Sequence, residues 1–273
     1  MCGNSSRAYA AKQRQGRIWT IWRCDSRACR HGFVWPRPGL TELTDVNQAE
    51  SVASDLGLPT PTGAMSRRDV RITVELVTRV RGKAKGGRML DVGAGDGSFS
   101  AGLSTAGYRA HMIDLDQRCG RAVETVPGAS FALETFEGLS DRGPYELILM
   151  SQVLEHALDP ADWLGRARGL LAPGGMVVVL LPNFGGIYRL LGSRDPYLIP
   201  PVHVNFFTPG SLERAMVSAG LVVRSMDSDS WIGGGGGMAK RVAAGLVSVV
   251  RGVVDPRAMG IILRGVGGVG GVT

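Results

Sequence analysis

Short apolar runs alternate with segments of helical spacing through the middle of this chain, and the alternation predicts an α/β fold. Apolar runs with the length of strands lie at 88–92, 109–114, 129–133, 145–150 and 175–181. Segments with the spacing of helices lie at 97–106, 117–125 and 161–171. The run at 177–181 reads Val-Val-Val-Leu-Leu, as expected of a strand covered on both faces. The pattern favours a doubly wound, mostly parallel sheet.

The pattern continues beyond this body and then changes character. A helix over 209–219 and a strand over 221–226 are expected next. Five glycines at 233–237 precede an amphipathic segment at 238–254, read as a lid or packing helix, with a membrane-surface or dimer helix as the alternative. A last strand over 260–263 is expected to run antiparallel beside 221–226. The residues from 265 to 273 are mostly glycine and valine and predict a disordered tail, so that 233–264 forms a separate tail unit.

The first strand of the body ends in a glycine turn that opens a helix. Residues 89–98 read Met-Leu-Asp-Val-Gly-Ala-Gly-Asp-Gly-Ser. Glycine has no Cβ, so a ligand can approach the backbone closely, and the following helix aims its free N–H groups at the same place. Asp114 follows Gly93 by about 20 positions, where a Rossmann-type unit binds ribose hydroxyls.

Two kinds of ligand suit such a turn, a dinucleotide and S-adenosylmethionine. The dinucleotide fingerprint is G-x-G-x-x-G, but here the third glycine is Gly97 and Ser98 stands in the fingerprint position. S-adenosylmethionine carries no phosphate and offers a ribose, an adenine, a carboxylate and an amine. Asp91 before the turn and Asp114 after it suit those groups, so the pattern favours S-adenosylmethionine, with a Rossmann domain for another ligand as the alternative.

An ordered set of motifs resembles the class I S-adenosylmethionine-dependent methyltransferases. In chain order the set is 90–97, 113–116, 145–149, 153–156 with Asp159-Pro160, 171–175 and 181–183. It looks most like the branch that contains ubiquinone-biosynthesis O-methyltransferases and methyltransferases of sugars and secondary metabolites. Glu146 departs from the family, which usually has Asp there. The resemblance implies a seven-strand sheet of methyltransferase type within a domain over 66–232, and it favours a helix over 66–80 before the first strand.

The resemblance also implies a cofactor site around the glycine turn and the ends of the following strands. Leu115 would pack under the adenine, and Thr135 and Phe136, in the turn after the third strand, would touch it. Ser151 and Gln152 follow the fourth strand, where a plain connecting loop is the alternative. The full expected set is Asp91, Gly93, Ala94, Gly95, Gly97, Asp114, Leu115, Thr135, Phe136, Ser151 and Gln152.

Three further residues are expected to serve the transfer itself. Methyl transfer from a sulfonium is an in-line displacement with a neutral leaving group, so the protein must align the reactants and remove a proton from a poor nucleophile. Glu155 and His156 resemble the Glu-His pair of the family. His203 lies in a segment that resembles the Pro-x-x-His segment over the substrate pocket, and it is our preferred base. For both histidines a structural hydrogen-bonding role is the alternative, and Asn183 is expected to line the pocket or cap its turn.

Residues 1–38 form a basic leader that differs from the rest of the chain. They hold eight Lys or Arg residues against one Asp, which accounts for the net charge of +7. Residues 39–65 read as a linker. The spacing of Cys24, Cys29 and His31 resembles the second half of a zinc ribbon. Two interpretations follow: a zinc site formed by Cys2, Cys24, Cys29 and His31, or a degenerate ribbon that binds no metal.

Composition and motifs limit the function. No run of 18 apolar residues predicts a membrane span, no secretory h-region is seen, and four cysteines in 273 residues argue against a disulfide scaffold, so a cytoplasmic protein is expected. We expect methylation of a small-molecule acceptor, most often on oxygen. An RNA methyltransferase that uses the basic leader is the alternative, although 151–154 lack the Asn/Asp-Pro-Pro-aromatic motif of base-amine methylation. A non-catalytic cofactor-binding module is a third reading.

Overall fold

The computed structural model describes six stretches of the chain, and the fold is stated for these residues. They are 3–14, 16–43, 45–46, 67–81, 86–229 and 262–269. Cys2, the five glycines at 233–237 and the predicted helix at 238–254 lie outside the described residues.

A seven-stranded sheet forms the centre of the molecule, in the order β10-β11-β8-β7-β4-β5-β6. The strands from β4 to β8 run parallel, and β11 runs antiparallel to both of its neighbours. The predicted doubly wound, mostly parallel sheet is therefore confirmed. The strands are β4 Gly87–Val92, β5 Tyr108–Asp114, β6 Ser130–Leu133, β7 Tyr145–Ser151, β8 Leu171–Pro182, β10 Val222–Asp229 and β11 Ile262–Gly268.

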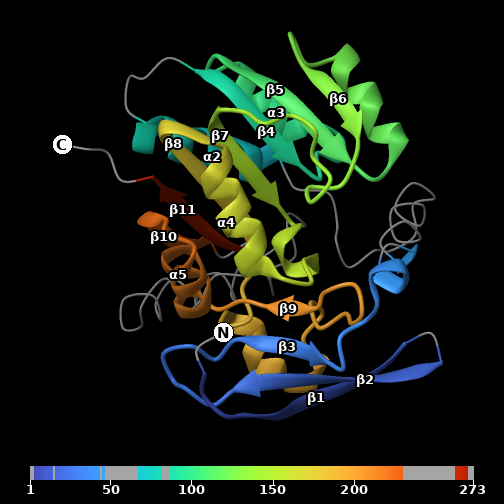
Figure 1. Ribbon diagram of the computed structural model, residues 1–273. Helices are drawn as coiled ribbons and strands as arrows, with labels where there is room; N and C mark the ends of the chain where they lie inside the picture. Colours follow the sequence, from blue (N-terminus) through green and yellow to red (C-terminus); the bar gives the residue numbers. More distant parts are fainter. Residues whose placement is uncertain are drawn as a thin grey trace, which may run out of the picture.

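Helices cover both faces of this sheet because its strands send alternate side chains to opposite sides. Leu147 and Leu149 of β7 lie in the core under one pair of helices, while Ile148 and Met150 lie in the core under the other pair. Figure 1 shows the layers. The first pair is α2 Arg67–Arg81 and α3 Ser98–Ser104, and the second is α4 Pro160–Leu170 and α5 Pro209–Ser218.

Local sequence explains where the second pair of helices begins. The Asp159 carboxylate accepts hydrogen bonds from the N–H groups of Ala161 and Asp162, and Pro160 fills the first helical position. Thr208 and Ser211 form a reciprocal capping box at the start of α5. Both helices therefore begin at the edge of the sheet where the parallel strands have their carboxyl ends. The caps hold the ends of the loops that lead from β7 to α4 and from β8 to α5.

The last strand confirms one prediction and overturns another. The expected antiparallel pairing beside 221–226 is present as β10 and β11. The predicted disordered tail is wrong for residues 265–268, which lie within β11. A Cβ on Gly265 would stand 2.9 Å from Met216 of α5, so the glycine that suggested disorder instead lets a helix approach the strand.

The leader forms a second, antiparallel sheet that includes a strand from the main body. Its order is β1-β2-β3-β9, and β9 is Asn205–Phe206, from the connection between β8 and α5. Figure 1 shows this sheet at the bottom of the view, beneath the seven-stranded sheet. Trp19, Ile21 and Val34 of the leader share one core with residues of the body. The leader strands are β1 Ser6–Arg14, β2 Arg17–Cys24 and β3 Gly32–Trp35.

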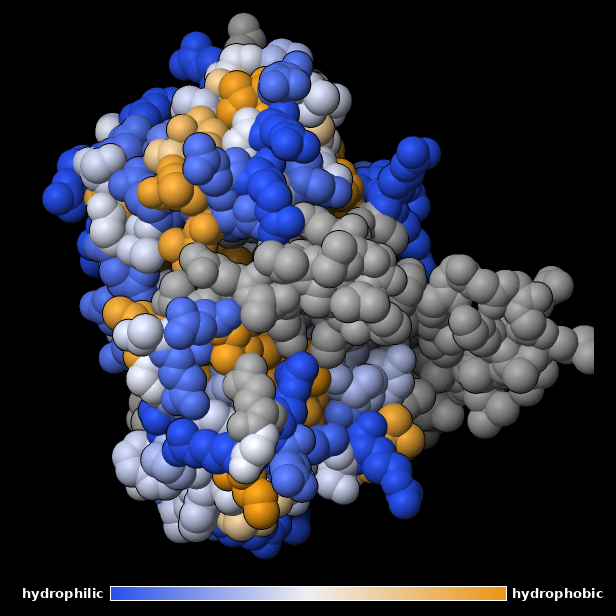
Figure 2. Space-filling model, turned by 90° about the vertical axis from the view of Figure 1, so that its right-hand side faces the viewer, coloured by the Kyte–Doolittle hydropathy of each residue, from blue (hydrophilic) through white to orange (hydrophobic). Residues whose placement is uncertain are grey.

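Length and hydropathy decide whether any of the described helices could span a membrane. None of the described helices is long and apolar enough to span a bilayer. On the face in Figure 2, hydrophilic residues dominate the described surface and hydrophobic residues form separate patches.

Arg37 anchors the leader to the segment that carries His203, and its loss should destabilise the fold. Its guanidinium donates hydrogen bonds to the Val204 carbonyl and to Asn205 Oδ1, both at 2.9 Å. Asn205 in turn donates to the Ala157 carbonyl at 2.6 Å. Arg37→Ala should lower the free energy of unfolding by about 1.5–3 kcal/mol in urea denaturation, because charged hydrogen bonds are lost from acceptors that belong to the buried residues Val204 and Asn205.

Two variants set the scale for that measurement. Arg37→Lys should fall between wild type and Arg37→Ala, because an ammonium keeps the charge but cannot form the forked contact. Arg7→Ala removes an exposed ion pair with Asp25 and should cost about 1 kcal/mol or less. Equal losses for Arg37→Ala and Arg7→Ala would contradict the anchoring role.

Candidate functional site

The glycine turn lies at the carboxyl edge of the sheet, between β4 and α3. Gly93, Gly95 and Gly97 have φ values of 66°, 53° and 73°, a left-handed conformation that side chains other than glycine rarely adopt. A Cβ on Gly93 would lie 2.3 Å from Val153 Cγ1, and one on Gly97 would lie 2.5 Å from the Ala122 Cβ. The turn therefore exists as predicted, and its bare backbone is required both by conformation and by close packing.

Asp114, at the end of β5, holds this turn in place. Its carboxylate accepts hydrogen bonds from the Gly95 N–H at 3.0 Å and from the Asp116 N–H at 2.9 Å. Gly93 and Ala94 donate to the Ile113 carbonyl beside it. The carboxylate and the turn thus form one unit, with Leu115 next to it and 37% exposed. Ribose binding by Asp114 and adenine packing on Leu115 stay predictions.

Asp91 lies beneath the turn and is almost fully buried. It accepts a 2.6 Å hydrogen bond from the Ser100 hydroxyl of α3. Burial raises the pKa of Asp91 to about 6, although the Ser100 hydroxyl opposes this shift. Asp91 therefore orders the start of α3, and its charge changes within reach of neutral pH.

The raised pKa of Asp91 predicts a pH-dependent stability. An unfolded aspartate titrates near 3.8, so between pH 3.8 and about 6 the folded protein keeps a proton that the unfolded chain has released. Wild-type stability should then fall as pH rises through this window, by up to about 1.4 kcal/mol per pH unit relative to Asp91→Asn, which cannot ionise. Urea unfolding at pH 4, 5, 6 and 7 measures the difference.

The control for this titration is Asp96→Asn, because Asp96 is exposed in the same turn. Its unfolding free energy should follow that of wild type across the series. A constant difference between Asp91→Asn and wild type at all four pH values would show that burial does not perturb Asp91.

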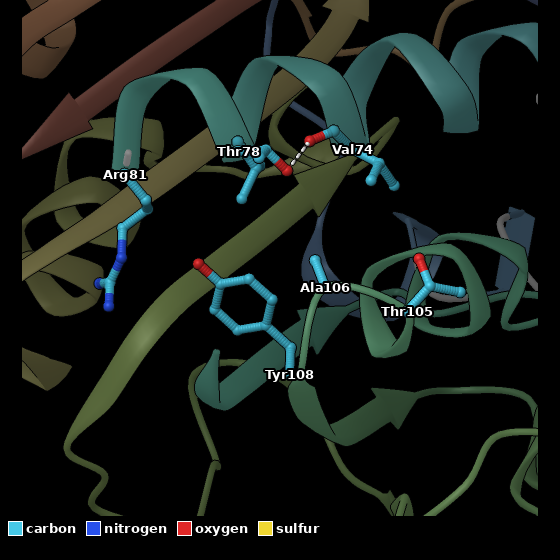
Figure 3. A pocket seen from close by; sticks show the side chains of 7 residues that line it. Val74, Thr78, Arg81, Thr105, Ala106 and Tyr108 are labelled. Carbon is cyan, nitrogen blue, oxygen red and sulfur yellow. Dashed lines mark hydrogen bonds between the residues drawn. The ribbon is translucent and has the colours of Figure 1, made fainter. Parts of the chain in front are cut away.

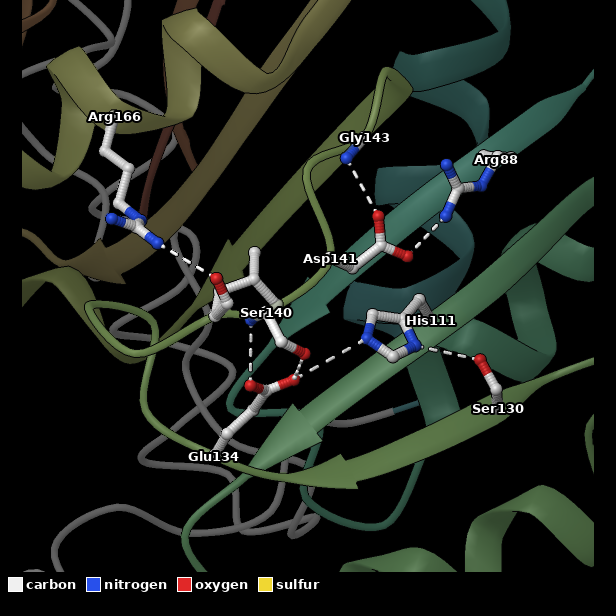
Figure 4. Close-up of polar contacts among 9 residues, drawn as sticks. Arg88, His111, Ser130, Glu134, Ser140, Asp141, Gly143 and Arg166 are labelled. Carbon is white, nitrogen blue, oxygen red and sulfur yellow. Dashed lines mark hydrogen bonds and ion pairs between the residues drawn. The ribbon is translucent and has the colours of Figure 1, made fainter.

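Polar contacts hold the loop that follows β6. The Glu134 carboxylate accepts from the Ser140 N–H at 2.9 Å, and the Thr135 hydroxyl accepts from the Gly138 N–H at 2.9 Å. Figure 4 shows Glu134 and Ser140 beside His111 and Ser130 of the two neighbouring strands. Phe136 is buried with its ring 5.2 Å from that of Trp163. The expected adenine contacts of Thr135 and Phe136 stay predictions.

The segment after β7 lies directly against the glycine turn. Gln152 takes a positive φ of 57° and donates its N–H to the Leu180 carbonyl at 2.8 Å. Val153 follows and fills the space that a Cβ on Gly93 would occupy. The short helix η2, Leu154–His156, comes next. The candidate cofactor turn and the Glu155-His156 pair are therefore neighbours.

Glu155, His156 and His203, predicted from two separate segments, lie together. Each offers a ligand atom, and these atoms all lie within 4.8 Å of one another. The two imidazole rings are 5.0 Å apart at an angle of 81°. The Val204 N–H donates to the Glu155 carbonyl at 3.0 Å, which joins the two segments.

The backbone fixes both imidazoles in one orientation. His156 Nδ1 lies 2.9 Å from the Val202 carbonyl, and His203 Nδ1 lies 3.0 Å from the Tyr197 carbonyl. A carbonyl only accepts, so both Nδ1 atoms carry the proton, and the lone pair of the neutral His203 ring is on Nε2, while His156 also interacts with the Gln152 backbone. The cluster therefore presents the basic Nε2 of His203 beside the Glu155 carboxyl group and the His156 ring.

Burial keeps this cluster in its neutral forms. It raises the pKa of Glu155 to about 8, lowers the pKa of His156 to about 4, and lowers the pKa of His203 well below 6.5. Both Glu155 carboxylate oxygens and His203 Nε2 are buried without a hydrogen-bond partner among the described residues. Buried polar atoms of this kind are usually paired in a native fold, with a water, an ion or another bound group.

The leader does not assemble the predicted zinc site among the described residues. Cys24 and Cys29 are buried, and the His31 ring packs 4.8 Å from that of Phe207. Burial, with a smaller contribution from Arg37, lowers the pKa of His31 to about 4. These three side chains do not form a three-ligand group within the described part of the chain, and Cys2 lies outside it. The described residues therefore give no support to a zinc site in the leader.

A surface hollow elsewhere lies at the wrong edge of the sheet for this chemistry. Figure 3 shows it between α2 and the start of β5, whereas Asp114 stands at the opposite end of β5. Ligands of open α/β sheets bind at the carboxyl ends of the strands. The hollow is lined by Val74, Val77, Thr78, Arg81, Thr105, Ala106 and Tyr108.

The sequence singled out Asn183 but did not single out Arg37 and Asn205. Asn183 was expected to line the pocket or cap its turn, and its Oδ1 accepts from the Gly185 N–H at 2.9 Å, as a cap does. Arg37 and Asn205 support the His203 segment, but no motif marks them. Arg37 is one of eight basic residues in the leader, so composition alone hides its role.

The strand order, the glycine turn after the first parallel strand and the acidic residue at the end of the next strand define a class. They are the parts of a Rossmann-like, S-adenosylmethionine-dependent methyltransferase. Residues 66–226 match the family described as a methyltransferase domain, which is more than half of the chain. The chain belongs to this family and is an S-adenosylmethionine-dependent methyltransferase.

Relatives with curated functions are distant. The ubiquinone biosynthesis O-methyltransferase of Aeromonas salmonicida is 29% identical over 169 residues, which cover 57% of this chain and 71% of the relative. The enzyme of the same name from Alkalilimnicola ehrlichii is 27% identical over 169 residues, which cover 57% of this chain and 68% of the relative.

Solved structures agree on the fold. A putative methyltransferase in complex with the Haloferax volcanii Trm112 activator is 19% identical with a TM-score of 0.59, and the match covers 82% of this chain and 96% of that chain. The 1,6-didemethyltoxoflavin-N1-methyltransferase of Burkholderia thailandensis is 14% identical with a TM-score of 0.57, covering 94% and 98%. At these identities the likeness concerns the fold alone.

Proposed function

We propose that this methyltransferase transfers the methyl group of S-adenosylmethionine to an oxygen of a small-molecule acceptor, with His203 as the base. One observation carries the proposal: the Asp114-pinned glycine turn lies against Val153, two residues before Glu155 in the Glu155–His156–His203 cluster. A cofactor seated on the turn would hold its methyl group toward that cluster. The names of the O-methyltransferase relatives support oxygen as the acceptor atom.

The cofactor would be held by backbone and by a few polar side chains. The bare backbone of the glycine turn would lie against the S-adenosylmethionine, and the Asp114 carboxylate would accept hydrogen bonds from the ribose hydroxyls. Ser151 Oγ and Gln152 Nε2 are buried and have no hydrogen-bond partner among the described residues. Both can donate to the methionine carboxylate, which supports their place in the site.

The transfer itself needs alignment and one proton acceptor. As the acceptor oxygen forms its bond to the methyl carbon, the carbon–sulfur bond breaks, and the sulfur leaves as a neutral thioether that keeps the electron pair. The acceptor hydroxyl gives its proton to His203 Nε2, whose lone pair faces the cluster because Nδ1 is occupied by Tyr197.

Enclosure of the cluster favours a small acceptor over RNA. Glu155 and His203 are each 1% exposed, so a base within a long polymer would have to enter a closed site. Part of the leader's basic charge also serves packing: Arg37 donates to the body, and Arg14 reaches the Ile199 carbonyl at 3.5 Å. These contacts leave less of the leader for a phosphate backbone than its charge suggests.

A two-part experiment tests the proposal. Calorimetry should show S-adenosylmethionine binding to the full-length chain, and no binding would refute the cofactor site. Incubation with methyl-labelled cofactor and a panel of phenolic, catecholic and sugar hydroxyl acceptors should give a methyl ether, identified by mass spectrometry. Label found only in added RNA, or only on nitrogen, would overturn the small-molecule oxygen acceptor.

A further inference from the structure

We propose that Glu155, His156 and His203 together bind one divalent first-row transition-metal ion of the Zn²⁺, Co²⁺ or Mn²⁺ type. The inference rests on the proposed function, because the ion would stand next to the place where the acceptor oxygen is expected. It moves the metal away from the leader cysteines and onto the carboxyl edge of the sheet.

The spacing of the three groups is that of a metal site. Their ligand atoms all lie within 4.8 Å of one another. Ligands held at about 2.0–2.2 Å from a common ion in tetrahedral geometry stand roughly 3.3–3.6 Å apart, so side-chain rotations that draw the three groups together would complete the geometry. The ligands come from η2 and from the segment before β9, which the Val204–Glu155 backbone hydrogen bond already holds together.

Both imidazoles are oriented as metal-binding histidines are. A ligating histidine usually donates its other ring N–H to a carbonyl or carboxylate, which fixes the tautomer and points the lone pair at the ion. Here His156 uses Nδ1 on the Val202 carbonyl and His203 uses Nδ1 on the Tyr197 carbonyl. The outer contacts of a metal site are therefore already present.

The cluster also lacks the partners that its burial requires. Both Glu155 oxygens and His203 Nε2 are buried, and none of the described residues hydrogen-bonds to them. When Glu155 is ionised, the cluster holds three unpaired acceptor atoms around one point, which is costly in a dry interior. A cation satisfies all three at once, whereas a neutral hydroxyl has one proton to donate.

The chemistry of the donors selects the metal. Two imidazole nitrogens with one carboxylate suit Zn²⁺ and its neighbours, whereas Mg²⁺ and Ca²⁺ prefer oxygen ligands. Three protein ligands leave a position open, which an acceptor hydroxyl can fill. A bound hydroxyl releases its proton to solvent more readily, and the resulting oxyanion attacks the methyl carbon. His203 would then act as a ligand, and the ion would replace it as the activator of the acceptor.

Metal binding can be measured on the wild-type, full-length chain without any substrate. Protein stripped with a chelator should take up one equivalent of Zn²⁺ by competition against a chromophoric chelator, and excess Mg²⁺ should not displace it. Co²⁺ should give visible absorption bands of a low-coordinate nitrogen–oxygen site. Absence of both signals from folded protein would overturn the proposal.

Variants then assign the ion to this cluster. Glu155→Gln, His156→Gln and His203→Gln should each weaken Zn²⁺ binding at least 10-fold, with the Co²⁺ bands changed or lost. The matched control is the Cys24→Ala/Cys29→Ala double variant, which should bind Zn²⁺ as wild type does. Loss of the ion in the cysteine variant alone would place it in the leader and refute the cluster.

The metal and the methyl transfer can fail separately. If the stripped protein binds S-adenosylmethionine and methylates its acceptor at the wild-type rate, the metal proposal is wrong and the His203 base stands. If neither stripped nor Zn²⁺-loaded protein binds the cofactor, the proposed function itself fails.

Discussion

His203→Gln should lower kcat by about 10²- to 10⁴-fold, which is the range for loss of a catalytic proton acceptor. The side chain is 1% exposed, and its Nε2 has no hydrogen-bond partner among the described residues. Glutamine is close in size but has no basic lone pair. The loss is expected whether His203 takes the proton itself or holds an ion that activates the acceptor.

A split between binding and turnover separates this role from a structural one. The dissociation constant for S-adenosylmethionine should stay within about threefold of wild type, a difference of roughly 0.7 kcal/mol, because His203 is not among the residues proposed to hold the cofactor. His111→Gln is the matched control, since His111 lies on β5 with its Nδ1 on Ser130, away from the cluster. Parallel losses of cofactor affinity and kcat in His203→Gln would contradict a role in the transfer.

Much of the fold and of the site follows from local sequence. Buried parallel strands read as apolar runs, so the strands from β4 to β8 were predictable to within a few residues. The glycine turn was predictable because its three positive φ values need glycine. The meeting of Glu155 and His203 was expected only through the family resemblance, since 47 residues, which include α4 and β8, separate them.

Other features depend on contacts that no local pattern encodes. Strand β9 is two residues long, so it has no period, and it exists because β3 offers an open edge. Arg264 of β11 donates to Asp69 of α2 at 2.9 Å, and both are buried, which ties the last strand to the first helix of the body across 195 positions. The glycines of β11 suggested a tail because composition cannot tell a flexible glycine from one pressed against Met216.

Asp114→Ala should have the largest effect on the cofactor, a loss of about 2–4 kcal/mol or roughly 30- to 1000-fold in affinity for S-adenosylmethionine. Two contributions combine. The proposed hydrogen bonds to the ribose disappear, and the Gly95 and Asp116 N–H groups lose the carboxylate that positions the turn. Calorimetry with S-adenosylmethionine measures the loss.

Two variants separate these contributions. Asp114→Asn keeps one oxygen as acceptor and should retain part of the affinity. Asp116→Asn alters the neighbouring carboxylate, which caps η1, Gln117–Glu124, through the Arg118 N–H, and should leave cofactor affinity within about threefold, or roughly 0.7 kcal/mol. If Asp114→Ala bound S-adenosylmethionine as tightly as Asp116→Asn, the ribose would lie elsewhere and the glycine turn would have lost its assigned ligand.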